Sequence, residues 1–149
     1  MNKTTKSESS FELWRLIGKV NHSILLIRQR ELRQHHIPVR QLQVLAAIND
    51  MGSATTLSEL AKHVEREPNV MSKTTVVLEN DGLIKRIKKT HKSNILTLEL
   101  TEKGRSLLKV SRQSKSVEGI FSSLSETDRR QLKSMLNKVY SGTQKYNSI

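Results

Sequence analysis

One short segment of the chain changes its hydrophobic period, and this change limits the folds that the chain can adopt. In residues 95–100 every second residue is a leucine, which is the period of a β-strand. A shorter apolar run at residues 83–88 precedes it, and the polar residues 89–94 between them are typical of a hairpin turn. Elsewhere the apolar residues recur at helical spacing. The sequence therefore predicts a mainly α fold (α+β) with one small β-wing.

Two helices are predicted in the first third of the chain. The first runs from Phe11 to about Gln34, after a polar tail at residues 1–10 that we expect to be flexible. Pro38 ends this helix, because the residue before a proline avoids the helical conformation. It also opens the second helix, where its missing N–H costs nothing. The apolar face of the second helix comprises Leu42, Leu45, Ala46 and Ile48.

Two shorter helices follow. Thr56 and Glu59 fit a capping box, in which the threonine caps an amide of the first turn and the glutamate reaches back. The next helix runs from Pro68 to Asn80, and Gly82 can take the left-handed conformation that ends it. Two short helices, a turn and a β-hairpin together make a winged helix-turn-helix.

Further helices are predicted after the hairpin. Thr101 can cap a helix with a sparse apolar face, and Ser125 to Asp128 resembles a second capping box that starts the last helix. The sparse face comprises Val110, Val117, Phe121 and Leu124. The apolar residues of the last helix are Leu132, Met135, Leu136, Val139 and Tyr140.

A winged helix-turn-helix has the geometry to bind double-stranded DNA. Its second short helix lies in the major groove with its N-terminal residues at the base edges. The candidate base-reading residues there are Asn69, Ser72 and Lys73, since asparagine pairs with adenine and lysine with guanine. Thr56, at the start of the first short helix, is a candidate for the DNA backbone. The candidate wing residues are Arg86, Lys88, Lys89, Lys92 and Asn94.

The net charge points to a polyanionic partner, and its placement matters more than its size. The 149 residues include 26 Lys plus Arg and 14 Asp plus Glu, for a net charge of +12. Residues 55–104, which contain the predicted DNA-binding elements, are nearly balanced. However, no acid lies between Gly82 and Leu98, where five basic residues gather. Basic residues in such a run neutralise phosphates and release counterions.

Several other classes of protein are disfavoured. The chain has no cysteine, which excludes disulfides, Cys-based zinc sites and thiol redox sensors. Its histidines lack metal-ligand spacing, and the catalytic and phosphate-binding motifs are missing, so we expect no metal, no cofactor and no enzymatic activity. The longest apolar run, residues 24–27, is far short of the roughly 20 residues that span a bilayer. Because no signal peptide is evident, we expect a soluble cytoplasmic protein with no membrane partner.

Four segments resemble the MarR family of winged helix-turn-helix bacterial transcriptional regulators. Their order and spacing follow the family, and the resemblance extends from about Phe11 to Tyr146. The four segments are TLSELA at 56–61, LENDGLIKR at 78–86, LTEKG at 100–104 and SETDRRQL at 125–132.

The resemblance implies a homodimer that reads a pseudo-palindromic operator. Residues 11–37 and 105–149 would form the helical dimerisation layer, and residues 38–104 the winged helix-turn-helix domain. Many members of the family bind small phenolic or lipophilic effectors between these layers and release DNA in response. The residues of such a pocket are not assigned by the sequence.

The chain departs from the family pattern at two places. At the wing tip, where the family carries Asp-x-Arg or Asp-Arg-Arg, this chain has Lys92, Ser93 and Asn94. On the recognition helix, Val77 stands where family members often carry an arginine, and a valine there can only meet a thymine methyl group or pack inward. Arg86 closes the first wing strand of the motif, and it would either contact a phosphate or form a buried ion pair that braces the wing.

The leading hypothesis is a sequence-specific, ligand-responsive repressor that binds DNA as a homodimer. The alternative is a ligand-insensitive architectural protein, whose charge gives sequence-tolerant DNA affinity. An RNA-binding protein is a third class, which the scarcity of aromatic residues disfavours, since single-stranded RNA is usually held by stacking.

The wing tip leads to a first testable expectation. Lysine is more strongly hydrated than arginine and lacks its planar fork, so the wing should discriminate A·T sequences in the minor groove only weakly. We expect Lys92→Ala to lower DNA affinity by a similar factor on A·T-rich and G·C-rich duplexes, measured by fluorescence anisotropy. A changed sequence preference with unchanged general affinity would contradict this expectation.

Overall fold

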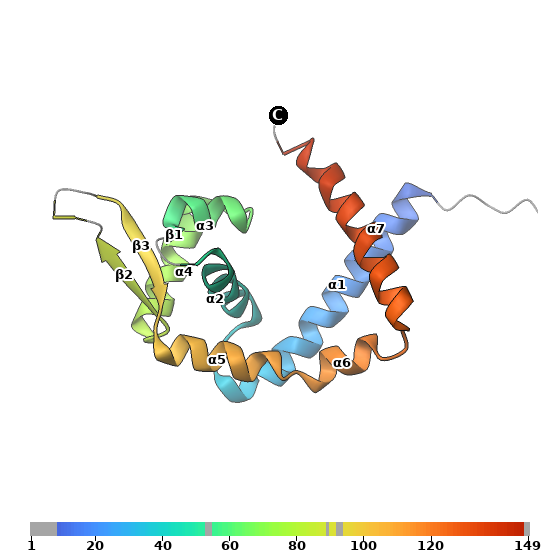
Figure 1. The fold of residues 1–149 in the computed structure, drawn as a ribbon, viewed down its shortest axis with the longest axis horizontal. Helices are drawn as coiled ribbons and strands as arrows, with labels where there is room; N and C mark the ends of the chain where they lie inside the picture. Colours follow the sequence, from blue (N-terminus) through green and yellow to red (C-terminus); the bar gives the residue numbers. More distant parts are fainter. Residues whose placement is uncertain (1–8, 53–54, 89, 92–93, 148–149) are drawn as a thin grey trace, which may run out of the picture. The chain divides into compact units, whose positions relative to one another are not determined.

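A computed structural model describes residues 9–52, 55–88, 90–91 and 94–147 of the chain. It divides into two compact units, Met1–Ser114 and Lys115–Ile149, which are described separately below. The first unit contains α1 (Ser10–Leu32), a 3₁₀ turn (Arg33–His35), α2 (Val39–Met51), β1 (Thr55–Thr56), α3 (Leu57–His63), α4 (Pro68–Asn80), β2 (Ile84–Lys88), β3 (Leu96–Leu100) and α5 (Glu102–Arg112) (Figure 1). The second unit contains α6 (Lys115–Phe121) and α7 (Glu126–Gln144).

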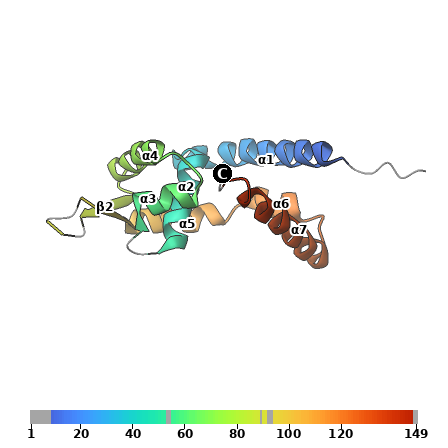
Figure 2. The same ribbon diagram turned by 90° about the horizontal axis from the view of Figure 1, so that it is seen from above.

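The predicted hairpin is confirmed as two strands of a small antiparallel sheet. The strand order is β1-β3-β2, and Arg86 lies opposite Leu98 across the β2–β3 pair. Ile84 and Leu98 of these strands are buried in the core of the first unit, and the far end of the hairpin extends beyond the helices (Figures 1 and 2). Strand β1 was not predicted, because two residues are too few to show a period of two.

Local capping explains where the first helices begin. The Ser9 side chain accepts a hydrogen bond from the Glu12 amide, and Glu12 reaches back, which makes a capping box for α1. Pro38 lies at the N-cap of α2, one residue before its expected place inside the helix. There the first amide of the helix, on Val39, donates instead to the Gln29 side chain at 2.9 Å. The Thr56–Glu59 capping box of α3 forms as predicted.

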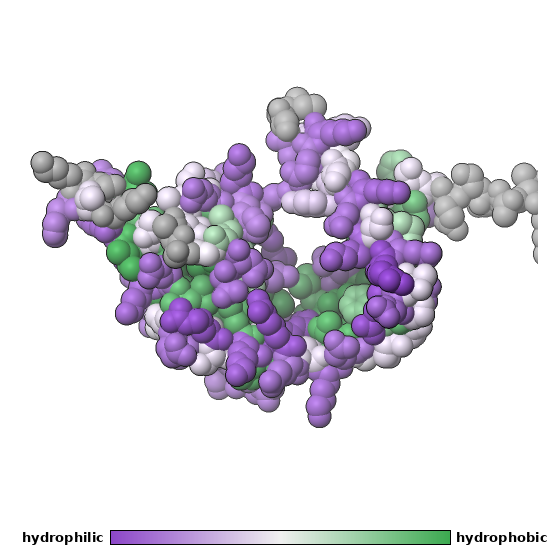
Figure 3. Space-filling model, in the orientation of Figure 1, coloured by the Kyte–Doolittle hydropathy of each residue, from purple (hydrophilic) through white to green (hydrophobic). Residues whose placement is uncertain are grey.

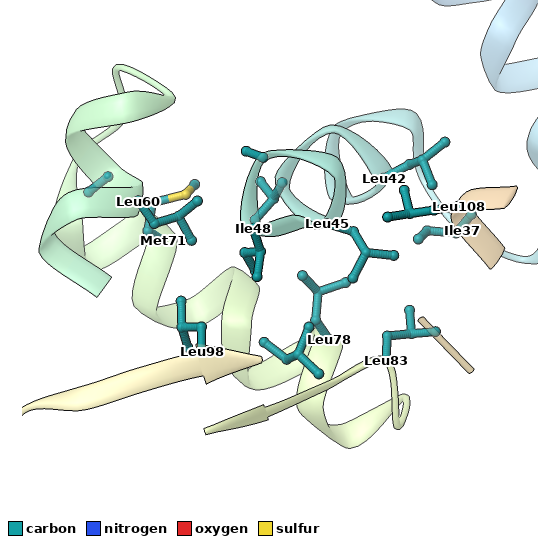
Figure 4. Close-up of a cluster of buried hydrophobic side chains, with 14 of the residues drawn as sticks. Ile37, Leu42, Leu45, Ile48, Leu60, Met71, Leu78, Leu83, Leu98 and Leu108 are labelled. Carbon is teal, nitrogen blue, oxygen red and sulfur yellow. The ribbon is translucent and has the colours of Figure 1, made fainter. Parts of the chain in front are cut away.

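The core of the first unit surrounds α2. Leu45, Leu60 and Leu78, from α2, α3 and α4, are fully buried, and the side chains of this cluster point toward one another (Figure 4). Each such leucine contributes roughly 1.5–3 kcal/mol of hydrophobic stabilisation. The predicted apolar face of α2 is too narrow, because Val44 and Ala47 are buried as well. Helix α2 contacts α1, α3, α4, α5 and β3, so neighbours cover more of its circumference than one stripe.

The turn between α4 and β2 ends α4 as predicted and joins it to α5. Gly82 has a φ of +71°, and the Leu83 amide donates to the Leu78 carbonyl at 2.9 Å, which is the Schellman motif. The Thr101 hydroxyl then donates to the Gly82 carbonyl at 2.6 Å. The same hydroxyl caps α5 by accepting a hydrogen bond from the Gly104 amide, so one side chain fixes both segments.

The prediction of one long helix after Thr101 is wrong, because the chain forms two helices there, α5 and α6. Helix α5 ends at Arg112, and Gln113 has a non-helical ψ of 44°. The buried Ser111 hydroxyl donates to the Leu108 carbonyl at 2.8 Å, and the buried Ser114 hydroxyl donates to the Glu31 carboxylate of α1 at 2.7 Å. Serines that bond to the backbone and to another helix in this way compete with continued helix.

The second unit is a pair of helices in which α7 starts with the predicted capping box. The Ser125 hydroxyl and amide both donate to the Asp128 carboxylate, which holds the pKa of Asp128 below its ordinary value. The stabilisation of the folded state by these hydrogen bonds is therefore present at neutral pH, and it is lost as the pH falls through the lowered pKa of Asp128. Within the unit, the predicted apolar face of α7 is exposed at Met135, Leu136, Val139 and Tyr140.

The unit boundary places α1 and α5 with the winged helix. It does not coincide with the predicted boundary at residue 105, and the dimerisation roles of residues 11–37 and 105–149 stay predictions. None of the helices in the described part of the chain is long and apolar enough to cross a membrane.

The approach of α5 to the α4–β2 turn leads to a stability prediction. A Cβ atom added at Gly104 would lie 2.2 Å from the Leu83 carbonyl oxygen, so backbone would have to move. We expect Gly104→Ala to lower the free energy of unfolding by about 1–3 kcal/mol in urea denaturation. The control is Gly18→Ala, in a helix where an added Cβ meets nothing within 4 Å. Equal midpoints for the two variants would contradict this account.

Candidate nucleic-acid interface

Helices α3 and α4 form the helix-turn-helix, and a tight turn sets the angle between them. The Arg66 amide donates to the Ala61 carbonyl at 2.9 Å, and Glu65 has a left-handed φ of +53°. This is a second Schellman motif, with glutamate where glycine is usual. Pro68 then opens α4 at its first turn, where proline is favoured.

Helix α4 buries one strip and exposes the opposite face. Met71, Thr75 and Leu78 are buried against the core, which leaves Asn69 and Lys73 exposed on the far side of the helix. Ser72 is half-buried at the edge of that face. The three predicted base-reading residues therefore come from the first half of α4, and the two exposed ones point away from the protein.

Strand β2 divides the basic residues of the wing between two faces. Side chains alternate along a strand, so Arg86 and Lys88 share one face with Leu98 and Leu96 of β3, and Lys85 lies on the other. On that other face, Glu99 is the cross-strand partner of Lys85. Lys88 is exposed on the face that also contacts α4. Only part of the basic run is thus directed toward the recognition helix.

Arg86 is held by the recognition helix itself. Its backbone amide donates to Glu79 Oε2 at 3.0 Å, and its Nε lies 3.9 Å from the same oxygen. The Arg86 side chain is 24 % exposed, and its Nε is buried without a hydrogen-bond partner among the described residues. Of the two predicted roles, this geometry favours the brace. Glu79 was not foreseen, because nothing local in the sequence links positions seven residues apart across a turn.

The structure describes only two of the four remaining candidate DNA-contacting residues, Thr56 and Asn94. Thr56 is half-buried, and its side-chain oxygen accepts the Glu59 amide at 3.2 Å, which leaves its hydroxyl hydrogen able to donate to a phosphate. Asn94 is exposed between the wing tip and β3. Lys89 and Lys92 lie outside the described residues, so their role at the wing tip stays a prediction.

An acidic residue, Glu67, stands at the start of α4. Glu67 is its N-cap residue, and the side chain of Glu67 makes no capping hydrogen bond. A carboxylate at this end opposes the attraction of a helix N-terminus for phosphate. Any phosphate contact near this end is therefore expected from side chains and not from the N-terminus of α4.

A cavity of about 430 Å³ lies within the first unit, between the 3₁₀ turn, α5 and the C-terminal end of α4. Its apolar lining includes Ile37, Leu107 and Val110, and His35 and Lys103 add polar groups. Among the described residues, no cluster of three His, Asp or Glu side chains is arranged to hold a metal ion.

Comparisons with known proteins match the fold but not the sequence. No protein-family model matches the chain, and no curated protein is significantly similar to it. A MarR protein from Peptoclostridium difficile has a TM-score of 0.80 at 16 % identity, covering 98 % of this chain and 94 % of that one. The organohalide-sensing transcriptional regulator RdhR, bound to 2,4-dichlorophenol, has a TM-score of 0.77 at 23 % identity, covering 96 % and 90 %.

A third solved structure is the complex of S. aureus MepR with DNA, with a TM-score of 0.72 at 23 % identity. It covers 93 % of this chain and 99 % of that one. These similarities confirm the predicted mainly α winged-helix fold, which is the fold of MarR-type regulators.

The brace between α4 and the wing leads to a prediction. Removing either partner should weaken the attachment of β2 to the recognition helix, and removing both should add little. We expect a double-mutant cycle of Glu79→Gln and Arg86→Gln to give a coupling of about 1 kcal/mol in the free energy of unfolding, discounted for the exposure of Glu79. The matched control is the more exposed ion pair of Glu102 and Arg105, for which we expect almost no coupling. Additive effects at Glu79 and Arg86 would rule out the brace.

Proposed function

We propose that the chain is a MarR-family transcriptional regulator that binds double-stranded DNA in a sequence-specific manner. The observation that carries the proposal is the outward face of α4, where Asn69 and Lys73 stand opposite the buried strip and beside the basic wing. An exposed helix of this width fits the major groove, and lysine and asparagine are suited to base edges. The DNA complex of MepR, which has the same fold, supports this use of the fold.

We further propose that the regulator acts as a homodimer on a pseudo-palindromic operator. Helix α1 exposes a large apolar surface in the single chain, with Trp14 68 % exposed and Phe11 packed edge-to-face against it. Figure 3 shows green hydrophobic surface between the purple hydrophilic side chains. Contiguous exposed apolar surface is typical of a protein interface, and α7 has a second such face. Sedimentation of the protein as a monomer at micromolar concentration would contradict the dimer.

Repression then follows from occupancy of a promoter, and an effector reverses it. Two recognition helices would lie about one helical turn of DNA apart. A small apolar effector would favour an arrangement that no longer matches successive grooves. Its preference for that state must be roughly 10⁴-fold to empty a nearly full site. The dichlorophenol-bound RdhR structure and the cavity beside Ile37 support an effector of this kind.

The test is a comparison of specific and non-specific DNA affinity. A duplex selected from a randomised pool and a scrambled duplex of equal composition are titrated with the full chain at two salt concentrations. We expect at least a thousandfold preference for the selected duplex, as for specific regulators (~10³–10⁷-fold). Lys73→Ala should reduce affinity by about 1–3 kcal/mol, and the control Lys109→Ala, an exposed lysine of α5, should change it little.

Two results would overturn the proposal or part of it. A specificity ratio near one, with a steep salt dependence, would indicate the architectural alternative instead. The same titration is repeated with 2,4-dichlorophenol as the probe compound. Unchanged operator affinity with this compound would remove the support that the RdhR structure gives to a chlorophenol-type effector.

A further inference from the structure

The outward face of α4 contains few polar groups able to read bases. The Thr74 hydroxyl donates to the Val70 carbonyl at 2.9 Å, so its hydrogen is used within the helix itself. The Glu79 carboxylate, which could accept from cytosine, is bound to Arg86. Direct polar readout is left mainly to Asn69 and Lys73, with Asn80 at the far end.

Two valines stand on this face beside Lys73. Val76 is 39 % exposed and Val77 is 41 % exposed, so neither packs inward like Met71 or Leu78. At about 100° per residue, Lys73 lies almost opposite the buried strip, and the two valines lie on either side of it. Val77 follows Lys73 by one turn, about 6 Å along the axis, or close to two base-pair steps.

Valine is suited to a rigid apolar contact. Its branched side chain has one strongly preferred χ1 rotamer in a helix, so little side-chain entropy is lost when it meets a surface. Val76 and Val77 are buried less completely than Met71 and Leu78, so part of each side chain is available for contact with a partner molecule.

We propose that Val76 and Val77 are specificity-determining residues that contact the 5-methyl groups of thymines in the major groove. This inference rests on the proposed DNA-binding function. Among the base edges of the major groove, the thymine methyl is the apolar group that a valine can contact. Charge complementarity supports DNA as the occupant of this face, because Lys73 places an ammonium group between the two valines and the exposed Lys88 lies on the adjacent wing.

Uracil provides a direct test, because it keeps the O4 acceptor of thymine and lacks only the methyl group. The duplex selected from a randomised pool is resynthesised with each thymine replaced in turn by deoxyuridine. We expect uracil to lower affinity about fourfold at one or more thymines that face α4, as for the loss of one buried methyl group. Replacement at the other thymines should have little effect.

Variants identify the side chains responsible. Val77→Ala and Val76→Ala should each reduce the preference for thymine over uracil at one of the sensitive positions, while preference at the remaining bases is kept. The matched control is Val117→Ala, a valine of α6 in the second unit that should leave the thymine preference unchanged. Circular dichroism checks that each variant is folded, and the uracil scan of the unaltered protein is decisive even where a variant does not fold.

The outcomes separate this inference from the function on which it rests. If no sequence is selected from the pool, the proposed sequence-specific DNA binding fails. If a sequence is selected but uracil is tolerated at every thymine, the methyl contact is wrong and the regulator proposal stands. Thymine preference that persists undiminished in both valine variants would also overturn the assignment.

Discussion

The turn at residues 81–83 is the constraint on which the rest of the proposed DNA-binding surface depends. It ends α4, starts β2 and receives the first turn of α5, all within a few residues. Gly82 provides the left-handed conformation, and Gly104 permits a backbone approach that no other residue would allow. Backbone hydrogen bonds join Leu83 to Leu78 and to Thr101, and the side chains of Thr101 and Lys103 donate to the Gly82 and Asp81 carbonyls. Backbone and side-chain contacts together therefore position α4 and the wing.

Acidic and basic side chains lie together on the surface around α4. The overall excess of basic residues is large, but the described surface around α4 includes Glu65, Glu67 and Glu79 as well as Lys73 and Arg86. Glu79 holds Arg86 in place, and Glu67 keeps the start of α4 unattractive to phosphate. A helix with this arrangement is better suited to contact with base edges than to uniform attraction along the backbone.

Features with a local cause were predictable from the sequence. Capping boxes at Thr56 and Ser125, the glycine end of α4 and the period-two strand of the wing all follow from residues a few positions apart. The break at Gln113 was missed because Ser114 bonds to Glu31, which is 83 residues earlier in the chain. The bracing role of Arg86 was one of two predicted alternatives, but its partner Glu79 was not foreseen, because the two residues are joined across the turn at residues 81–83. The sequence placed Asn69 and Lys73 on a helix. The burial of Met71, Thr75 and Leu78 in the structure was needed to show that Asn69 and Lys73 lie on its outward face.

The bonds at the end of α5 have a mechanical consequence. The Arg28 guanidinium donates to the Ser111 carbonyl at 3.0 Å and pairs with Glu31, which also accepts the Ser114 hydroxyl. At its other end, α5 is fixed to the α4–β2 turn through Thr101. An 11-residue helix, about 16 Å long, is thus clamped at both ends. We therefore expect α5 to act as a rigid strut that passes a displacement of the C-terminal end of α1 to the base of the wing.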